Sequence, residues 1–207
     1  MSATKLSPHR VYDPLLRTLH WTIALSVVTL VATSQLADAF EHSAAETTLW
    51  NAHLVTGYVF VAALLARLLW GVVGPASARW SDLWHPAAWR DLFRLHLPVS
   101  HRAGHDPVAS LGYLFAYLVM AVMAVTGIGL AAIEFEAGPL VPWLAGAKGF
   151  EDLLEEPHEA GFALLLIFIG LHLAALAFHH WRGERVAQSM ITGKQYLDPE
   201  RAIRHDH

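Results

Sequence analysis

The chain has 207 residues, of which 55% are hydrophobic and 15% charged, and its formal net charge is −4. This charged fraction is well below the rough quarter that is typical of soluble domains, which favours a membrane protein. The sequence contains no cysteine, so haem attachment through CxxCH, cysteine-ligated iron–sulfur clusters and disulfides within the chain are excluded. We expect no nucleic-acid partner.

Four stretches are apolar over roughly 20 residues, which is the length that crosses a bilayer. These stretches are residues 18–38, 51–73, 108–133 and 158–181. We predict an all-α integral membrane protein, with a four-transmembrane-helix domain over residues 1–181. Pro157 is expected to break the connection before the fourth span. Residues 182–207 are polar and predict a C-terminal tail made of a short helix and a loose end.

The first span has a second interpretation as a cleaved signal peptide. The residues Ala37, Asp38 and Ala39 follow its apolar run and match an A-x-A cleavage site. The span is long for the apolar region of a signal peptide, and its start carries His20 and Trp21. We therefore favour a transmembrane helix.

The distribution of charge predicts the orientation in the membrane. Basic residues are concentrated before the first span, between the second and third spans, and after the fourth. The other two connections contain Lys148 as their only basic residue and many carboxylates. The positive-inside rule therefore predicts that both termini are cytoplasmic, and that the outer surface is acidic.

Four histidines belong to the apolar spans: His20 in the first, His53 in the second, and His158 and His172 in the fourth. An imidazole in hydrocarbon needs a partner, and two neutral imidazoles can bind a haem iron from its two sides. The topology puts His53 and His158 towards the outside, and His20 and His172 towards the cytoplasm. His158 and His172 are about four helical turns apart and therefore share a face. We predict two b haems, one bound by each pair.

The inner ligand on the fourth span has an alternative. His179 lies nearly on the same face as His172, but it would put the haems about 31 Å apart, a full bilayer thickness. We therefore favour His172. The third span, residues 108–133, contains no histidine, and we expect it to contribute packing only.

Two arginines and two glycines are further candidates for haem binding. Arg67 lies inside the second span, where a haem propionate would be a suitable partner, with snorkelling to the interface as the alternative. Arg17 is a weaker candidate for the same role. Gly57 and Gly161 lie close to the outer histidines, where a missing Cβ would admit a flat macrocycle or simply allow helices to pack. Both interpretations of the glycines stay open.

Several short strings accompany these histidines in a fixed order. They are R-x-x-H-W at residues 17–21, R-L-L-W-G-V-V-G at 67–74, G-H-D-P-V-A-S at 104–110 and S-M-I-T-G-K at 189–194. With the histidines, they make residues 10–196 similar to the prokaryotic cytochrome b561 family, which includes the b-type cytochrome subunits of nickel–iron hydrogenases. The resemblance implies a four-helix bundle of the bacterial inner membrane that encloses two bis-histidine b haems. Asp106 departs from the asparagine that relatives often have.

The resemblance also implies a function. Family members carry electrons between the quinone pool and a partner that is often periplasmic, such as a hydrogenase or a c-type cytochrome. The chain would then be an electron-transfer subunit of an oxidoreductase, with quinone as mobile substrate and lipid around it. Whether it forms a homo-oligomer is left open.

Two other functions are alternatives to this role in electron transfer. Some relatives are superoxide oxidases that pass electrons from superoxide to ubiquinone, but acidic outer connections repel an anion and attract a basic protein partner. A transporter that binds metal or relays protons would explain single buried histidines, but not two pairs at matched depths.

Overall fold

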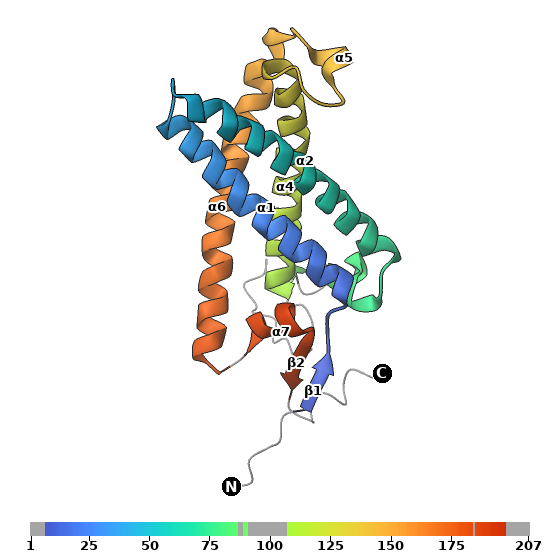
Figure 1. Cartoon of the computed structure of the whole chain (residues 1–207). Helices are drawn as coiled ribbons and strands as arrows, with labels where there is room; N and C mark the ends of the chain where they lie inside the picture. The colour runs from blue at the N-terminus through green and yellow to red at the C-terminus, as the bar shows by residue number, and fades with distance from the viewer. Residues whose placement is uncertain (1–6, 87–88, 91–106, 184, 198–207) are drawn as a thin grey trace. The chain divides into compact units, whose positions relative to one another are not determined.

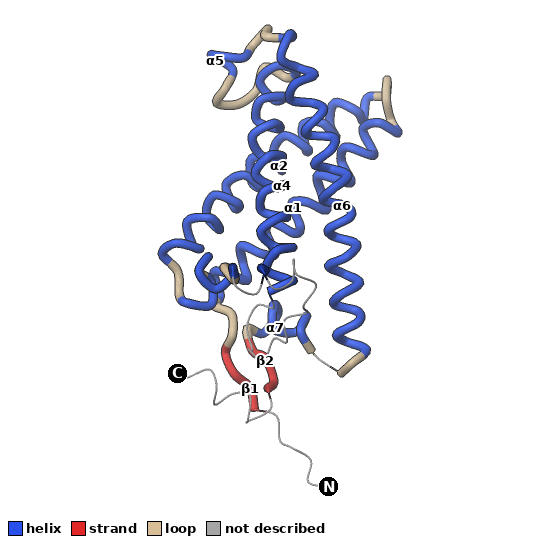
Figure 2. The backbone as a smooth tube through the Cα atoms, turned by 180° about the vertical axis from the view of Figure 1, so that it is seen from behind, coloured by secondary structure: helices blue, strands red, loops and turns tan. Residues whose placement is uncertain are grey.

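Helices make up most of the computed structural model, which describes residues 7–86, 89–90, 107–183 and 185–197 (Figures 1 and 2). The four long helices are α1 (Pro14–Ala39), α2 (Ala44–Val73), α4 (Pro107–Glu134) and α6 (Glu151–Trp181). The short elements are β1 (Ser7–Arg10), η1 (Ala76–Ala78), η2 (Trp80–Leu83), α5 (Val141–Leu144), η3 (Lys148–Phe150), α7 (Val186–Thr192) and β2 (Lys194–Leu197).

The four predicted spans are confirmed as four helices that are long and apolar enough to cross a membrane. The prediction for Pro157 was wrong, because α6 begins at Glu151 and this proline lies inside the helix. Hydropathy detects only the apolar part of a helix, whereas the first turns of α6 are acidic. Carboxylates are favourable at a helix N-terminus, so the helix extends beyond its apolar part at the expense of one backbone hydrogen bond at the proline.

The long helices expose large apolar side chains along much of their length. Leu25 on α1 is 62% exposed, Leu118 on α4 is 64% exposed and Leu171 on α6 is 67% exposed. Such surfaces are unfavourable in water but match the hydrocarbon of a bilayer. The pattern of exposure therefore agrees with helices that face lipid.

The residues form two compact units, and the long helices contribute to both. The first unit comprises residues 1–18, 68–116 and 168–207, and the second comprises residues 19–67 and 117–167. Each unit is described by itself below. The division into a domain of residues 1–181 and a tail of residues 182–207 stays a prediction.

In the first unit, a two-stranded antiparallel sheet joins segments from the two ends of the chain. Ser7 pairs with Leu197, and Arg10 pairs with Lys194. The short helix predicted for the tail is confirmed as α7, but the residues directly after it form β2 and are not loose. Pairing between four-residue segments so far apart in sequence leaves no local pattern from which it could be predicted.

The end of α7 is fixed to the segment that precedes α1. Gly193 ends α7 in the left-handed conformation, with φ +74°. Its carbonyl accepts hydrogen bonds from the N–H groups of Val11 at 2.9 Å and Tyr12 at 3.4 Å. A Cβ at this position would lie 2.9 Å from the carbonyl oxygen of Tyr12, so both conformation and space favour glycine.

Asp13 connects the start of α1 to the end of α2. Its Oδ1 accepts a hydrogen bond from the Leu16 N–H at 3.0 Å, which satisfies one of the unpaired donors of the first turn. Pro14 then occupies the first helical position, where its missing N–H costs nothing. The other carboxylate oxygen accepts from Trp70 Nε1 at 3.4 Å.

Trp80 packs on the last turns of α2. Its Nε1 donates to the Leu68 carbonyl at 3.0 Å, and its indole covers Gly71, where a Cβ would overlap the ring. Arg79 then donates from Nε to the Gly74 carbonyl at 2.8 Å. The string at residues 67–74 therefore includes residues that build the end of α2.

The packing of Trp80 predicts that Gly71→Ala destabilises the protein by about 1–3 kcal/mol, because the new methyl overlaps an aromatic ring that is held by its hydrogen bond. Thermal unfolding in detergent measures this change. Gly170→Ala is the matched control, since a Cβ on this glycine of α6 meets nothing within 4 Å. Equal melting temperatures for the two variants would contradict the packing described.

Candidate functional site

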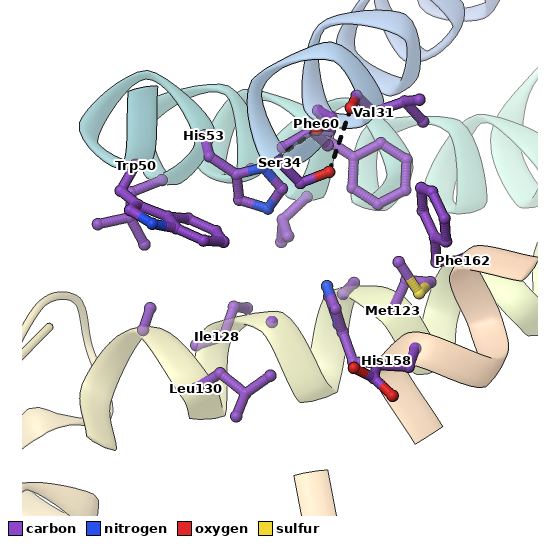
Figure 3. Close-up of a pocket in the computed structure, with 18 of the residues that line it drawn as sticks. Val31, Ser34, Trp50, His53, Phe60, Met123, Ile128, Leu130, His158 and Phe162 are labelled. Carbon is purple, nitrogen blue, oxygen red and sulfur yellow. Dashed lines mark hydrogen bonds between the residues drawn. The ribbon is translucent and has the colours of Figure 1, made fainter. Parts of the chain in front are cut away.

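The second unit contains a cavity of about 630 Å³, within the range of small-molecule and cofactor sites. Residues of α1, α2, α4 and α6 line it, and most of them are apolar. Within this unit, α2 contacts α1 and α6 contacts α4 through side chains described below. Figure 3 shows the cavity with side chains projecting into it from both sides.

His53 and His158 point into this cavity from opposite sides (Figure 3). His53 projects from α2, and His158 projects from α6. They are the two histidines that the sequence predicts as an outer pair. The structure therefore brings together on one cavity two imidazoles that are far apart in the chain.

The ring of His53 is held by α1. Its Nδ1 lies 3.2 Å from the carbonyl oxygen of Leu30 and 3.1 Å from Thr33 Oγ1. A carbonyl can only accept, and the Thr33 hydroxyl donates its own proton to the Thr29 carbonyl at 2.8 Å. The proton of the neutral ring therefore belongs on Nδ1, which leaves the lone pair on Nε2.

The ring of His158 is held by α4 in the same way. Its Nδ1 lies 2.8 Å from Thr126 Oγ1, and this hydroxyl donates its single proton to the Val122 carbonyl at 2.8 Å. With the hydroxyl proton on this carbonyl, Thr126 accepts the Nδ1 proton, and Nε2 of His158 keeps its lone pair. The expectation that the third span contributes packing only was wrong. A threonine in an apolar span usually contributes only to helix packing. The contact of Thr126 with His158 depends on the register of α4 against α6, which the sequence does not show.

Three glycines near the histidines differ in their surroundings. Gly57 lines the cavity, and a Cβ there would approach only Leu30 Cδ2, at 4.0 Å. Gly161 is buried against Met123, with its Cβ position 2.6 Å from the sulfur, which favours the helix-packing interpretation. Gly127, which the sequence analysis missed, backs the ring of His158, because a Cβ there would lie 3.2 Å from Cε1.

Aromatic side chains form the wall beside His53. The ring of Trp50 meets that of His53 edge-on, with 5.5 Å between centroids, and lies 5.7 Å from the ring of Phe135. Tyr58 also lines the cavity, and its buried hydroxyl has no hydrogen-bond partner among the described residues. The oxygen of this hydroxyl lies against Gly138.

The charged lining of the cavity is acidic. Its carboxylates are Asp38, Glu134, Glu155 and Glu159. Among the described residues that line it, there is no lysine or arginine. The cavity therefore has a negative field, which favours cations and basic surfaces over anions.

His20 and His172 lie in different units, and neither lines the cavity. His20 meets the ring of Trp21 edge-on at 5.6 Å. The ring of His172 is stacked on Phe168, with centroids 5.9 Å apart and an interplanar angle of 15°.

The two candidate arginines contact other parts of the protein. Arg67 is 7% exposed, and its guanidinium carbon lies 5.5 Å from the centroid of the Tyr117 ring. It is thus buried among protein atoms and does not extend to a surface, and Tyr117 is a neighbour that the sequence analysis missed. Arg17 donates from Nη1 to the carbonyl of Ile191, so the structure gives this arginine a backbone partner at the end of α7.

The contact between Tyr58 and Gly138 predicts that a larger residue at position 138 destabilises the protein. Gly138 has φ +93°, and a Cβ there would overlap the Tyr58 hydroxyl. Gly138→Ala should therefore cost backbone strain of about 1–3 kcal/mol and a steric clash in addition. Gly146→Ala is the control, because Gly146 has φ +76° but nothing within 4 Å of its Cβ position.

Thermal unfolding should show a larger loss for Gly138→Ala than for Gly146→Ala. Adding Tyr58→Phe should reduce the loss at Gly138, since it removes the atom that the methyl meets. No recovery in this double variant would mean that the clash is not with Tyr58.

Comparison with known proteins identifies the family. The model of the family described as "Prokaryotic cytochrome b561" matches residues 11–193. A "probable Ni/Fe-hydrogenase B-type cytochrome subunit" of Azotobacter chroococcum is 30% identical over an alignment of 188 residues, and the match covers 79% of this chain and 78% of that protein.

Proteins with the same description in Bradyrhizobium diazoefficiens and Rhodobacter capsulatus are each 25% identical to the chain. The first match covers 91% of this chain and 86% of the relative, and the second covers 92% and 82%. No solved structure matches the chain. The family match and the four apolar helices together show that the chain belongs to the prokaryotic cytochrome b561 family and is a multi-pass protein of the bacterial inner membrane.

Proposed function

We propose that this chain is a di-haem b-type cytochrome that carries electrons across the inner membrane, between the quinone pool and a periplasmic redox partner. The observation that carries the proposal is the pair His53 and His158, which face one cavity with their Nδ1 protons already engaged. Haem b, when bound, supplies reversible one-electron chemistry, while the protein sets its ligation and surroundings.

The residues of the cavity fit a haem. Two neutral imidazoles with Nε2 lone pairs are the ligand set of bis-histidine cytochromes, and the mostly apolar walls suit a macrocycle. We therefore assign His53 and His158 as the axial ligands of the outer haem, with Gly57 beside the macrocycle.

His20 and His172 are proposed to bind the second, inner haem. This assignment depends on their depth in the predicted spans and on both termini being cytoplasmic. Arg67 is proposed to contribute positive charge near this haem, since a buried guanidinium favours a propionate as neighbour. Together, the two haems would provide an electron path between the outer and inner sides of the membrane.

The proposed partner is a hydrogenase or a c-type cytochrome with a basic surface. Relatives of this chain are named as hydrogenase cytochrome subunits, and the carboxylates around the outer cavity would attract a cationic protein. Quinone in the surrounding lipid is proposed as the mobile substrate.

The acidic lining of the cavity also argues against direct superoxide oxidation, because it would repel the superoxide anion.

Replacing both outer histidines by alanine should remove one haem and leave the other, because the His53→Ala/His158→Ala double variant has no imidazole ligand in the cavity. Haem content per polypeptide and reduced-minus-oxidised absorption spectra of the purified protein measure this outcome. His180→Ala should keep both haems. Retention of both haems by the double variant would refute the outer pair.

Single alanine variants of His172 and His179 test which of them binds the inner haem together with His20. His172→Ala should lose the inner haem, whereas His179→Ala should retain it, because only His172 lies at the depth predicted for His20. The reverse result would transfer the ligand role to His179. Haem content per polypeptide again distinguishes the two cases.

A further inference from the structure

Two threonines occupy equivalent places behind the outer histidines. Thr33 on α1 lies behind His53, and Thr126 on α4 lies behind His158. We propose that both threonines are positioning residues, which hold the Nδ1 protons of the axial histidines and thereby set the orientation and donor strength of the ligands. This inference rests on the proposed function, since it assumes that the histidines bind haem iron.

The hydroxyl groups are themselves fixed in direction. Thr33 Oγ1 donates to the Thr29 carbonyl at 2.8 Å, and Thr126 Oγ1 donates to the Val122 carbonyl at 2.8 Å. In both cases the acceptor lies four residues earlier on the same helix, so the single hydroxyl proton is used within the helix. Each hydroxyl can then only accept from the histidine. This arrangement favours the tautomer that carries its proton on Nδ1, which leaves the Nε2 lone pair for the iron.

The two histidines do not depend equally on their threonines. His53 Nδ1 also lies 3.2 Å from the Leu30 carbonyl, a backbone acceptor that no side-chain substitution removes. For His158, the described residues provide Thr126 as the hydrogen-bond acceptor, at the shorter distance of 2.8 Å. Thr126 should therefore have the larger influence on the bound group.

A hydrogen bond that accepts the Nδ1 proton increases electron donation from Nε2 to the iron, and stronger donation favours the ferric state. Removing the acceptor should therefore raise the reduction potential of the outer haem. It should also leave a buried N–H without a partner, which allows the ring to rotate away from its original plane.

Thr126→Val and Thr126→Ser form a matched pair that separates hydrogen bonding from packing. Valine keeps the branched shape but cannot accept the Nδ1 proton, whereas serine keeps the hydroxyl and loses a methyl group. We expect Thr126→Val to shift the ferric–ferrous equilibrium of the outer haem towards ferrous by roughly tenfold, or about 59 mV. Thr126→Ser should stay close to wild type, and Thr33→Val should show a smaller shift.

Spectroelectrochemical titration of the purified full chain measures the potentials, and the electron paramagnetic resonance g values of the ferric protein report the ligand orientation. Loss of the outer haem in Thr126→Val with retention in Thr126→Ser would also support the inference. A wild-type potential and unchanged g values in Thr126→Val would overturn it, as would a larger shift in Thr126→Ser. A wild-type protein without haem would instead refute the proposed function.

Discussion

A histidine inside a membrane protein has two ring nitrogens, and both need a partner because hydrocarbon provides none. In this chain, the Nδ1 atoms of His53 and His158 find acceptors on neighbouring helices, at 3.1 and 3.2 Å for the first ring and 2.8 Å for the second. Their Nε2 atoms are left for a group in the cavity. The helix contacts, the tautomers and the proposed chemistry all depend on these separate roles, in which Nδ1 bonds to a neighbouring helix and Nε2 faces the cavity.

The separate roles of the two ring nitrogens also divide the four long helices into two pairs within the second unit. α2 and α6 present the imidazoles, while α1 and α4 hold them through Thr33 and Thr126. Small residues make the arrangement possible, since a side chain on Gly127 would press on the ring of His158. The carboxylates of the lining then add a negative field around the two histidines, which would favour the basic partner that we propose.

Much of this organisation could be predicted from the sequence, because it depends on residue type and on depth along a span. Apolar runs of bilayer length predicted the four helices, and depth along the spans predicted that His53 and His158 lie near each other, in agreement with the cavity that both of them line. The roles of Thr126 and Gly127 could not be predicted, because they depend on the register of α4 against α6. The start of α6 at Glu151 and the pairing of β1 with β2 were also missed, since an acidic helical turn and a long-range strand pair leave no hydropathy signal.

In the proposed cytochrome, imidazoles from two different helices bind each haem iron from both sides. Electron paramagnetic resonance of the oxidised, purified wild-type protein tests it most directly, because two imidazole ligands produce a low-spin ferric iron. We expect essentially all of the haem iron to be low-spin. A dominant high-spin signal, which indicates an iron with an open axial position, would contradict it.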